Sequence, residues 1–190
     1  MLRLELCGAH THLHSTLCSH CPHGPAGCCA APPAVAWADL GRIAGLGGAA
    51  WLLDEMRSGR LRPSPRGLAI QRVPPAEIDG RAFPGRCVYL GPRGCVIPPD
   101  RRSATCNYYL CDEALAHGGE AGEAGAARAA HEILVDRYGQ WDQELACRVA
   151  AAWPGGPPWD APFLEWLGRE LDALLRRDRR ALRTLGRGAG

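Results

Sequence analysis

The sequence predicts an α+β fold, in which a small cysteine-rich half with a short hairpin packs against a C-terminal helical hairpin. Eight of the ten cysteines fall in two groups between residues 18 and 111. The residues between the groups are rich in Pro, Gly and Arg, which favours turns and short strands. After residue 126, apolar residues recur every three or four positions, as in amphipathic helices. We therefore divide the chain into residues 1–113 and residues 114–190, expected to form one compact domain.

Composition limits the classes of partner. The net charge is +2 and all 22 basic residues are arginine, so a nucleic-acid partner is not expected. The first 17 residues contain no apolar run of the length that a signal peptide needs, and no stretch approaches the roughly 18 to 20 apolar residues of a membrane span. We expect a cytoplasmic protein without membrane contact. Thiols stay reduced in the cytoplasm, and there clustered cysteines hold metal more often than they form disulfides.

The first cysteine group has the spacing C-x2-C-x6-C-C and consists of Cys18, Cys21, Cys28 and Cys29. A C-x-x-C pair can place both sulfurs on one metal ion, because the turn between them folds back on itself. Adjacent side chains on an extended backbone point to opposite sides. We therefore expect Cys28 and Cys29 to serve different metal ions, or different irons of one cluster. A disulfide or ordinary buried cysteines are the alternatives.

Five histidines precede or interrupt this group: His10, His12, His14, His20 and His23. Imidazole is a good ligand for zinc or iron, so one of them could replace a sulfur. For the first three we favour a mobile polar terminus whose histidines bind nothing. Cys7 and Cys147 have no cysteine close in sequence, and we expect both to be free buried thiols.

Between the groups, a helix is expected from Asp39, a good N-cap, to Met56. The glycines at positions 45, 47 and 48 should break or kink it. Residues 58–86 read as a connector with one short strand at residues 68–73.

The second group has the spacing C-x7-C-x10-C-x4-C and consists of Cys87, Cys95, Cys106 and Cys111. The loop at residues 91–94 predicts a hairpin that pairs Leu90 with Cys95. Thiolate sites carry negative charge, so the guanidinium of Arg102 could donate hydrogen bonds to the sulfurs that bind the metal. The alternative is an exposed arginine.

The last third predicts two helices. In the first, the apolar face consists of Ala127, Ala130, Leu134, Tyr138, Trp141, Leu145, Val149 and Ala152, and Pro154 follows its end. The second starts near Asp160, with Leu164, Leu167, Leu171, Leu174, Leu182 and Leu185 on one face. The arginines that crowd its end, at 176, 177, 179, 180, 183 and 187, are expected to be solvated and to complement the helix dipole.

Several of these motifs resemble the YkgJ-type cysteine-cluster family, described as a zinc- or iron-chelating domain. The resemblance covers roughly residues 15–113 and rests on the first cysteine group, residues 39–43 (DLGRI), residues 87–90 (CVYL), and residues 106–111 (CNYYLC). It implies a metal-binding module with eight ligands: Cys18, Cys21, Cys28, Cys29, Cys87, Cys95, Cys106 and Cys111. This chain has Arg102-Ser103 where family members often carry Arg-Pro, and its last third has no counterpart.

Two hypotheses of function follow. In the first, the eight thiols hold zinc ions or an iron-sulfur cluster and fill every coordination position, which leaves none for a substrate. The alternative is an iron-sulfur enzyme, because the resemblance extends loosely to flagellin lysine methylases, which use S-adenosylmethionine. No methyl-donor loop is recognisable, and no catalytic residue is assigned. We expect a polynuclear or two-site arrangement to which both groups contribute, with the two groups of sulfurs at a closest approach of about 4 to 8 Å.

Overall fold

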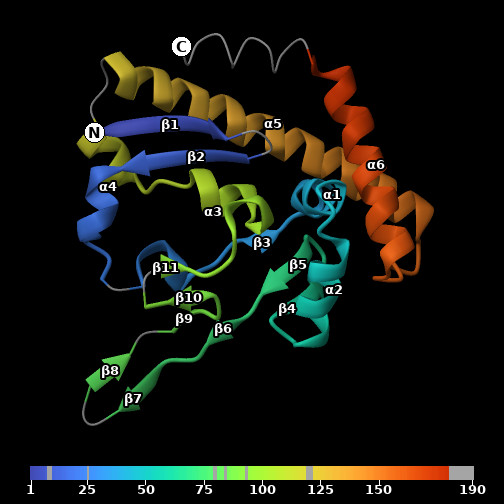
Figure 1. Cartoon of the computed structure of the whole chain (residues 1–190), viewed down its shortest axis with the longest axis horizontal. Coiled ribbons are helices and arrows are strands. Elements are labelled where there is room, and N and C mark those ends of the chain that lie inside the picture. Colours follow the sequence, from blue (N-terminus) through green and yellow to red (C-terminus); the bar gives the residue numbers. More distant parts are fainter. Residues whose placement is uncertain are drawn as a thin grey trace.

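A computed structural model describes residues 1–7, 10–24, 26–78, 81–83, 85–92, 94–118 and 122–179 of the chain. The protein mixes helices and strands and has a helical C-terminal region, as predicted (Figure 1). The helices are α1 (Trp37–Gly45), α2 (Ala49–Arg57), α3 (Ala104–Tyr108), α4 (Asp112–Gly118), α5 (Gly122–Ala152) and α6 (Ala161–Arg177). Three 3-10 helices are η1 (Thr16–His20), η2 (Gly27–Ala30) and η3 (Pro99–Arg101).

The described strands are short and form five small antiparallel sheets. They are β1 (Leu2–Cys7), β2 (His10–Ser15), β3 (Ala34–Val35), β4 (Leu61–Ser64), β5 (Gly67–Ile70), β6 (Arg72–Val73), β7 (Ala76–Ile78), β8 (Arg81–Phe83), β9 (Arg86–Cys87), β10 (Leu90–Gly91) and β11 (Gly94–Cys95). The sheet orders are β1-β2, β3-β5-β4, β6-β9, β7-β8 and β10-β11.

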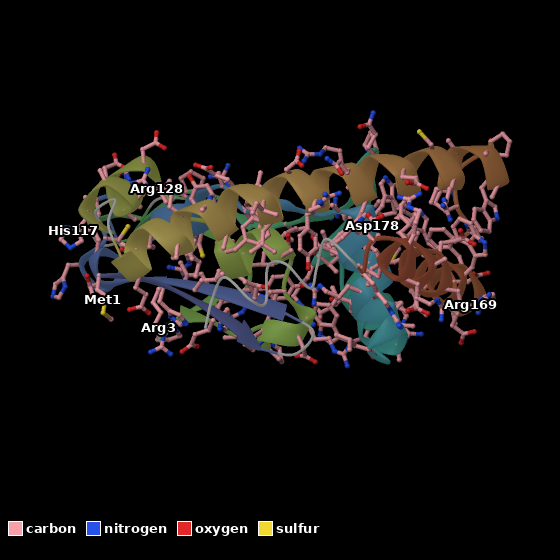
Figure 2. All side chains as sticks on the ribbon, turned by 90° about the horizontal axis from the view of Figure 1, so that it is seen from above. Met1, Arg3, His117, Arg128, Arg169 and Asp178 are labelled. Carbon is pink, nitrogen blue, oxygen red and sulfur yellow. The ribbon has the colours of Figure 1, made fainter. Side chains whose placement is uncertain are left out.

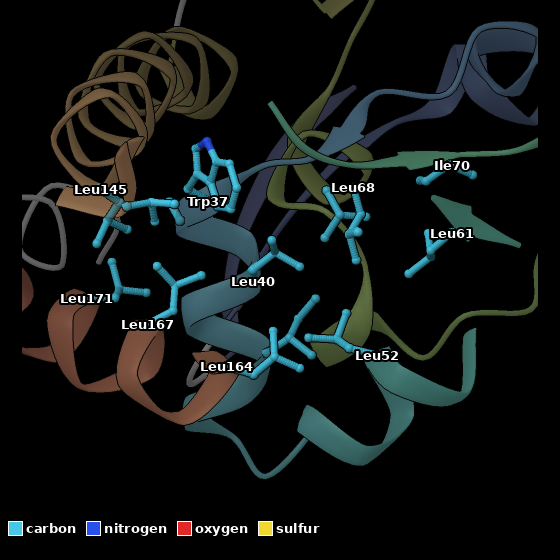
Figure 3. Packing of buried hydrophobic residues seen from close by; sticks show 14 of the residues in the cluster. Trp37, Leu40, Leu52, Leu61, Leu68, Ile70, Leu145, Leu164, Leu167 and Leu171 are labelled. Carbon is cyan, nitrogen blue, oxygen red and sulfur yellow. The ribbon is translucent and has the colours of Figure 1, made fainter. Parts of the chain in front are cut away.

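The largest hydrophobic cluster joins the two halves of the sequence. Leu40 and Ile43 of α1 pack with Leu145 of α5 and with Leu164 and Leu167 of α6 (Figure 3). The same cluster includes Cys87, Tyr89 and Ile97 from the second cysteine group. Burial of apolar surface therefore stabilises the C-terminal helices and one edge of the cysteine-rich half together.

The N-terminus forms a hairpin, so the predicted mobile polar terminus is wrong. β1 and β2 pair antiparallel with Leu4 opposite Leu13. Leu2 and Leu13 are buried in a second hydrophobic cluster with Ala127 of α5. Figure 2 shows the hairpin lying along the first half of α5, with α6 along the second half. Alternation of leucine with polar residues gives the hairpin one apolar face, and this face holds it on the helix.

The predicted break at the glycines is confirmed, because α1 ends at Gly45 and α2 begins at Ala49. Asp39 is not the N-cap, however. Helix α1 starts at Trp37, and the Asp39 carboxylate reaches back to accept a hydrogen bond from the Ala36 N–H at 3.3 Å. The connector also contains more strands than the sequence indicated, since β4 pairs with β5 in addition to the predicted strand.

The two C-terminal helices are confirmed. Pro154 follows the end of α5, and the Asp160 side chain caps α6 by accepting a hydrogen bond from the Phe163 N–H at 2.9 Å. Helix α6 packs closely on α1 through two glycines. A Cβ atom placed on Gly41 would lie 2.9 Å from both the Leu167 carbonyl oxygen and the Leu171 Cβ, and one on Gly168 would lie 3.2 Å from the Gly45 nitrogen.

We expect Gly41→Ala to lower the free energy of unfolding by about 1 to 3 kcal/mol, because the extra methyl group would force α1 and α6 apart. Gly139→Ala is the matched control, since Gly139 lies inside α5 with no neighbouring atom within 4 Å of the added Cβ. That control should raise stability by about 0.5 to 1 kcal/mol through backbone entropy. Urea unfolding of both variants measures the difference, and equal effects would contradict the tight crossing.

Arginines at the end of α6 make ion pairs in the part of the chain that the structure describes. Arg177 pairs with Glu144 at 2.8 Å and with Asp178 at 3.2 Å, and Arg176 pairs with Asp172 at 2.8 Å. The predicted arginines 180, 183 and 187, with Leu182 and Leu185, lie outside the described residues. None of the described helices has the length and apolar character that crossing a membrane requires.

Candidate metal centre

The first cysteine group lies in two 3-10 turns rather than in an extended segment. Cys18 belongs to η1, Cys21 follows it, and Cys28 and Cys29 belong to η2. Cys28 and Cys29 lie in a 3-10 turn, so the extended backbone on which the opposite-side expectation was based does not occur there, and the two thiols interact with each other. That Cys28 and Cys29 bind different metal ions, or different irons of one cluster, stays a prediction, but the extended backbone no longer supports it.

The interaction between the two thiols shifts their pKa values in opposite directions. Accepting the Cys29 hydrogen lowers the pKa of Cys28 to about 6, and the same bond, followed by removal from water, raises the pKa of Cys29. The interaction therefore favours the thiolate form of Cys28 over that of Cys29. Neighbouring thiolate character is a property that metal-binding cysteines require.

The second group is held by short strands and helices. The predicted hairpin is confirmed in register, since Leu90 of β10 pairs with Cys95 of β11. Cys87 is buried at the end of β9, where it pairs with Arg72 of β6. Cys106 lies in α3 and Cys111 immediately precedes α4.

Electrostatic interactions connect the two groups. The charges of Cys28, Cys87 and Cys106 contribute to the raised pKa of Cys29. Loss of surrounding water, and then the charges of Cys28 and Cys111, raise the pKa of Cys18. Segments far apart in sequence thus lie near each other, and η2 contacts β9 while η1 contacts α4.

Cys106 shows the same crowding. Its side chain keeps an exposed surface, yet partial removal from water raises the pKa of the thiol to about 12, with further contributions from Cys95 and Asp39. Charges of one sign gathered in this way repel one another. A bound cation would relieve that repulsion.

A four-sulfur site is not preassembled among the described residues. There, the one set of three or more His, Cys, Asp or Glu ligand atoms within 4.8 Å of one another consists of His23, Cys111 and Glu113. Thiols without a cation gain nothing by closing into a tetrahedron, and metal sites commonly form as the metal binds. The predicted closest approach of the two cysteine groups therefore stays a prediction.

A buried polar network fixes the loop between Cys95 and Cys106 to helix α1. Asp39 accepts hydrogen bonds from the Ser103 hydroxyl at 2.8 Å and from the Ala104 N–H at 2.6 Å. Arg42, also buried, donates to Asp39 at 3.4 Å, to the Asp100 carbonyl at 2.8 Å and to the Arg102 carbonyl. Burial raises the pKa of Asp39, and the Arg42 charge and these donors oppose that rise.

Arg102 was predicted to donate hydrogen bonds to sulfur, but its described hydrogen bonds go to backbone carbonyl oxygens. Its guanidinium is half-buried and donates to the Ile97 carbonyl at 2.7 Å and to the Cys95 carbonyl at 3.4 Å. These hydrogen bonds reach oxygen rather than sulfur. An effect of Arg102 on a metal would therefore act by positioning the backbone of Cys95.

A second buried anchor holds the strand that follows Cys87. The Tyr89 hydroxyl donates to Glu55 at 2.6 Å, and Arg60 donates to the same carboxylate at 2.5 and 2.8 Å. Hydrogen bonds from Arg60, and then from Tyr89, lower the pKa of Glu55. The anchor ties helix α2 to the second cysteine group.

The Glu55 anchor predicts a pH dependence. Because the folded-state pKa lies below the unfolded value of about 4.3, the stabilisation by Glu55 is fully present above that value and is lost as the pH falls through the folded pKa. The stability difference between wild type and Glu55→Gln should stay constant from pH 7 to about 5 and shrink in stronger acid. Urea unfolding across this range measures it. The exposed Glu165→Gln gives the baseline, and a Glu55→Gln difference that grows in acid would contradict the prediction.

The other candidate ligands have partners or lie elsewhere. His12 shares a hydrogen bond of 3.2 Å with Asn107, and His14 shares one of 3.3 Å with Glu5. Cys147 is exposed on α5, so the predicted buried thiol is wrong there. The side chains of Cys7 and His10 lie outside the described residues.

A cavity of about 550 Å³ lies away from the cysteines, between the ends of α5 and β4 and the start of α1. Its lining includes Trp37, Trp153, Trp159 and Pro63, with none of the eight predicted ligands among the described residues that line it. The cavity is therefore not part of the predicted cysteine centre.

Sequence reasoning missed Glu113, which the structure places beside Cys111 and His23. Its proximity to Cys111 in sequence was the available signal, but the contact with His23 spans 90 residues and depends on the fold. Comparisons of the chain with family models, with curated proteins and with solved structures found no match.

Proposed function

We propose that this protein is a metal-binding cysteine-cluster protein, in which Cys18, Cys21, Cys28, Cys29, Cys87, Cys95, Cys106 and Cys111 hold zinc ions or an iron-sulfur cluster. The observation that carries the proposal is that the segments bearing the two groups lie together, since η2 contacts β9 and η1 contacts α4; the charges of Cys87 and Cys106 also act on Cys29. Thiols crowded at one place, with raised pKa values caused partly by each other, favour a bound cation.

The buried network around Asp39 supports the same proposal. A loop that carries two predicted ligands is fixed to α1 by an aspartate and an arginine, both almost fully buried. Fixing ligand-bearing backbone in advance reduces the ordering that metal binding must impose. The iron-sulfur enzyme alternative uses the same eight ligands, and none of these described cysteines lines the cavity between α5, β4 and α1.

Metal analysis of the anaerobically purified chain tests the proposal. Cys29→Ser and Cys106→Ser should each lower metal affinity at least about tenfold, because each removes a ligand rather than a supporting group. Cys147→Ser is the matched control, since this exposed cysteine lies outside both groups, and it should behave as wild type. A brown protein would indicate an iron-sulfur cluster and a colourless metal-loaded protein would indicate zinc. Equal metal retention by all three variants would overturn the proposal.

A further inference from the structure

Three side chains from distant segments converge beside the cysteine groups. His23 lies in the turn between η1 and η2, while Cys111 and Glu113 lie at the start of α4. One ligand atom from each lies within 4.8 Å of the other two. His23 Nε2 is 3.2 Å from Glu113 Oε2, and the Cys111 thiol shares a hydrogen bond with the same carboxylate. Figure 1 shows α4 beside the segment that follows β2.

The donor set matches zinc in number and kind. Zinc takes histidine nitrogen at about 2.0 to 2.1 Å, thiolate sulfur at about 2.3 Å and carboxylate oxygen at about 2.0 to 2.2 Å. Ligand atoms around a tetrahedral ion then lie roughly 3.3 to 3.8 Å apart. One of the three pairs already has nearly this separation, since His23 Nε2 lies 3.2 Å from Glu113 Oε2, and the other two pairs lie within 4.8 Å.

Two of the three side chains in this set are open to solvent. The side chains of His23 and Glu113 are 47% and 54% exposed, and Cys111 is half-buried. Three protein ligands with a fourth position left to water is the arrangement of zinc sites that exchange or react, whereas closed structural sites use four protein ligands. An ion held here would be open to ligands from solution.

We propose that His23, Cys111 and Glu113 form a zinc site with one open coordination position, beside the proposed eight-cysteine centre. The two sites share Cys111, whose charge also acts on Cys18, and the proposal otherwise does not depend on the cysteine centre. The site therefore lies at the edge of the cysteine groups, where an exchangeable ion would be next to the other thiols.

The chain supplies its own matched control. His14 and Glu5 form a surface histidine–glutamate pair at 3.3 Å, nearly the same separation as His23 and Glu113, and their side chains are similarly exposed. That pair has no cysteine within the 4.8 Å that defines the His23 group, among the described residues. If a histidine–glutamate pair alone bound zinc, both pairs would do so.

The test titrates the zinc-loaded, reduced full chain with a chromophoric zinc chelator. We expect His23→Ala and Glu113→Gln each to weaken one zinc equivalent at least about tenfold, while His14→Ala and Glu5→Gln follow the wild-type curve. Cobalt in place of zinc should show a sulfur-to-metal charge-transfer band that Cys111→Ser diminishes.

The outcomes separate this proposal from the eight-cysteine centre. If His23→Ala and Glu113→Gln release zinc as wild type does, the open site is excluded, whatever the cysteine variants show. If both weaken one equivalent while Cys29→Ser and Cys106→Ser leave every equivalent unchanged, the open site stands and the cysteine centre fails. Equal weakening by the His14 and Glu5 variants would assign the effect to surface charge and overturn the proposal.

Discussion

Replacing Asp39 by asparagine is expected to lower the free energy of unfolding by about 3 to 5 kcal/mol, the range for breaking a buried ion pair from one side. The Asp39 side chain is buried, at 3% exposed, and its carboxylate accepts hydrogen bonds from four residues: Arg42, Ser103, Ala104 and Ala36. An amide has one acceptor oxygen and no charge, so it would leave Arg42 buried without a counter-charge and some donors unpaired.

Asp54→Asn provides the control for Asp39→Asn. Asp54 and Arg57 form an aspartate–arginine pair with the same spacing of three residues, but their side chains are 61% and 74% exposed. An exposed pair contributes about 0 to 1 kcal/mol, so this variant should unfold close to wild type in urea. Similar midpoints for the two variants would show that the buried network does not anchor the loop between Cys95 and Cys106.

Removal of metal should loosen the cysteine-bearing turns and spare the hydrophobic core. Residues 16–31 bury one hydrophobic side chain among the described residues, Ala26, so apolar burial cannot order this segment. Ordering costs about 1 to 2 kcal/mol per residue, whereas a structural zinc ion contributes roughly 10 to 16 kcal/mol in peptides. Helices α1 and α6 bury Leu40, Ile43, Leu164 and Leu167 and need no metal to stay packed.

Hydrogen exchange before and after chelation measures this difference. Amides in residues 16–31 should exchange much faster in the metal-free chain, while those in α1, α5 and α6 keep most of their protection. Reloading with zinc should restore the slow exchange and controls for damage by the chelator. Unchanged exchange in residues 16–31 after complete metal removal would contradict a metal-organised segment.

Local sequence signals predicted the parts of the fold that local chemistry controls. Pro154 and Asp160 marked the end of α5 and the cap of α6 because prolines and capping carboxylates act within a few residues. The loop at residues 91–94 predicted the Leu90–Cys95 register for the same reason. The N-terminal hairpin was missed although Leu2, Leu4 and Leu6 alternate with polar residues, because the histidines of the second strand suggested a polar terminus.

Contacts between residues far apart in the sequence determine the features that local sequence signals did not predict. Asp39 read as a helix cap, yet its main partners, Ser103 and Ala104, lie 64 and 65 residues away. The position of Glu113 beside His23 likewise depends on how η1 packs on α4. The spacing of the cysteines can be read from short stretches of sequence, and it therefore identified the candidate site. How their thiols assemble depends on binding of the metal ion itself.

X-ray absorption at the metal edge of the anaerobically purified full chain tests directly whether the cysteine thiols bind a metal. We expect zinc or iron with mainly sulfur neighbours, at about 2.3 Å for zinc, and loss of sulfur neighbours in Cys106→Ser but not in Cys147→Ser. Metal surrounded by nitrogen and oxygen alone, or the same sulfur coordination in both variants, would contradict it.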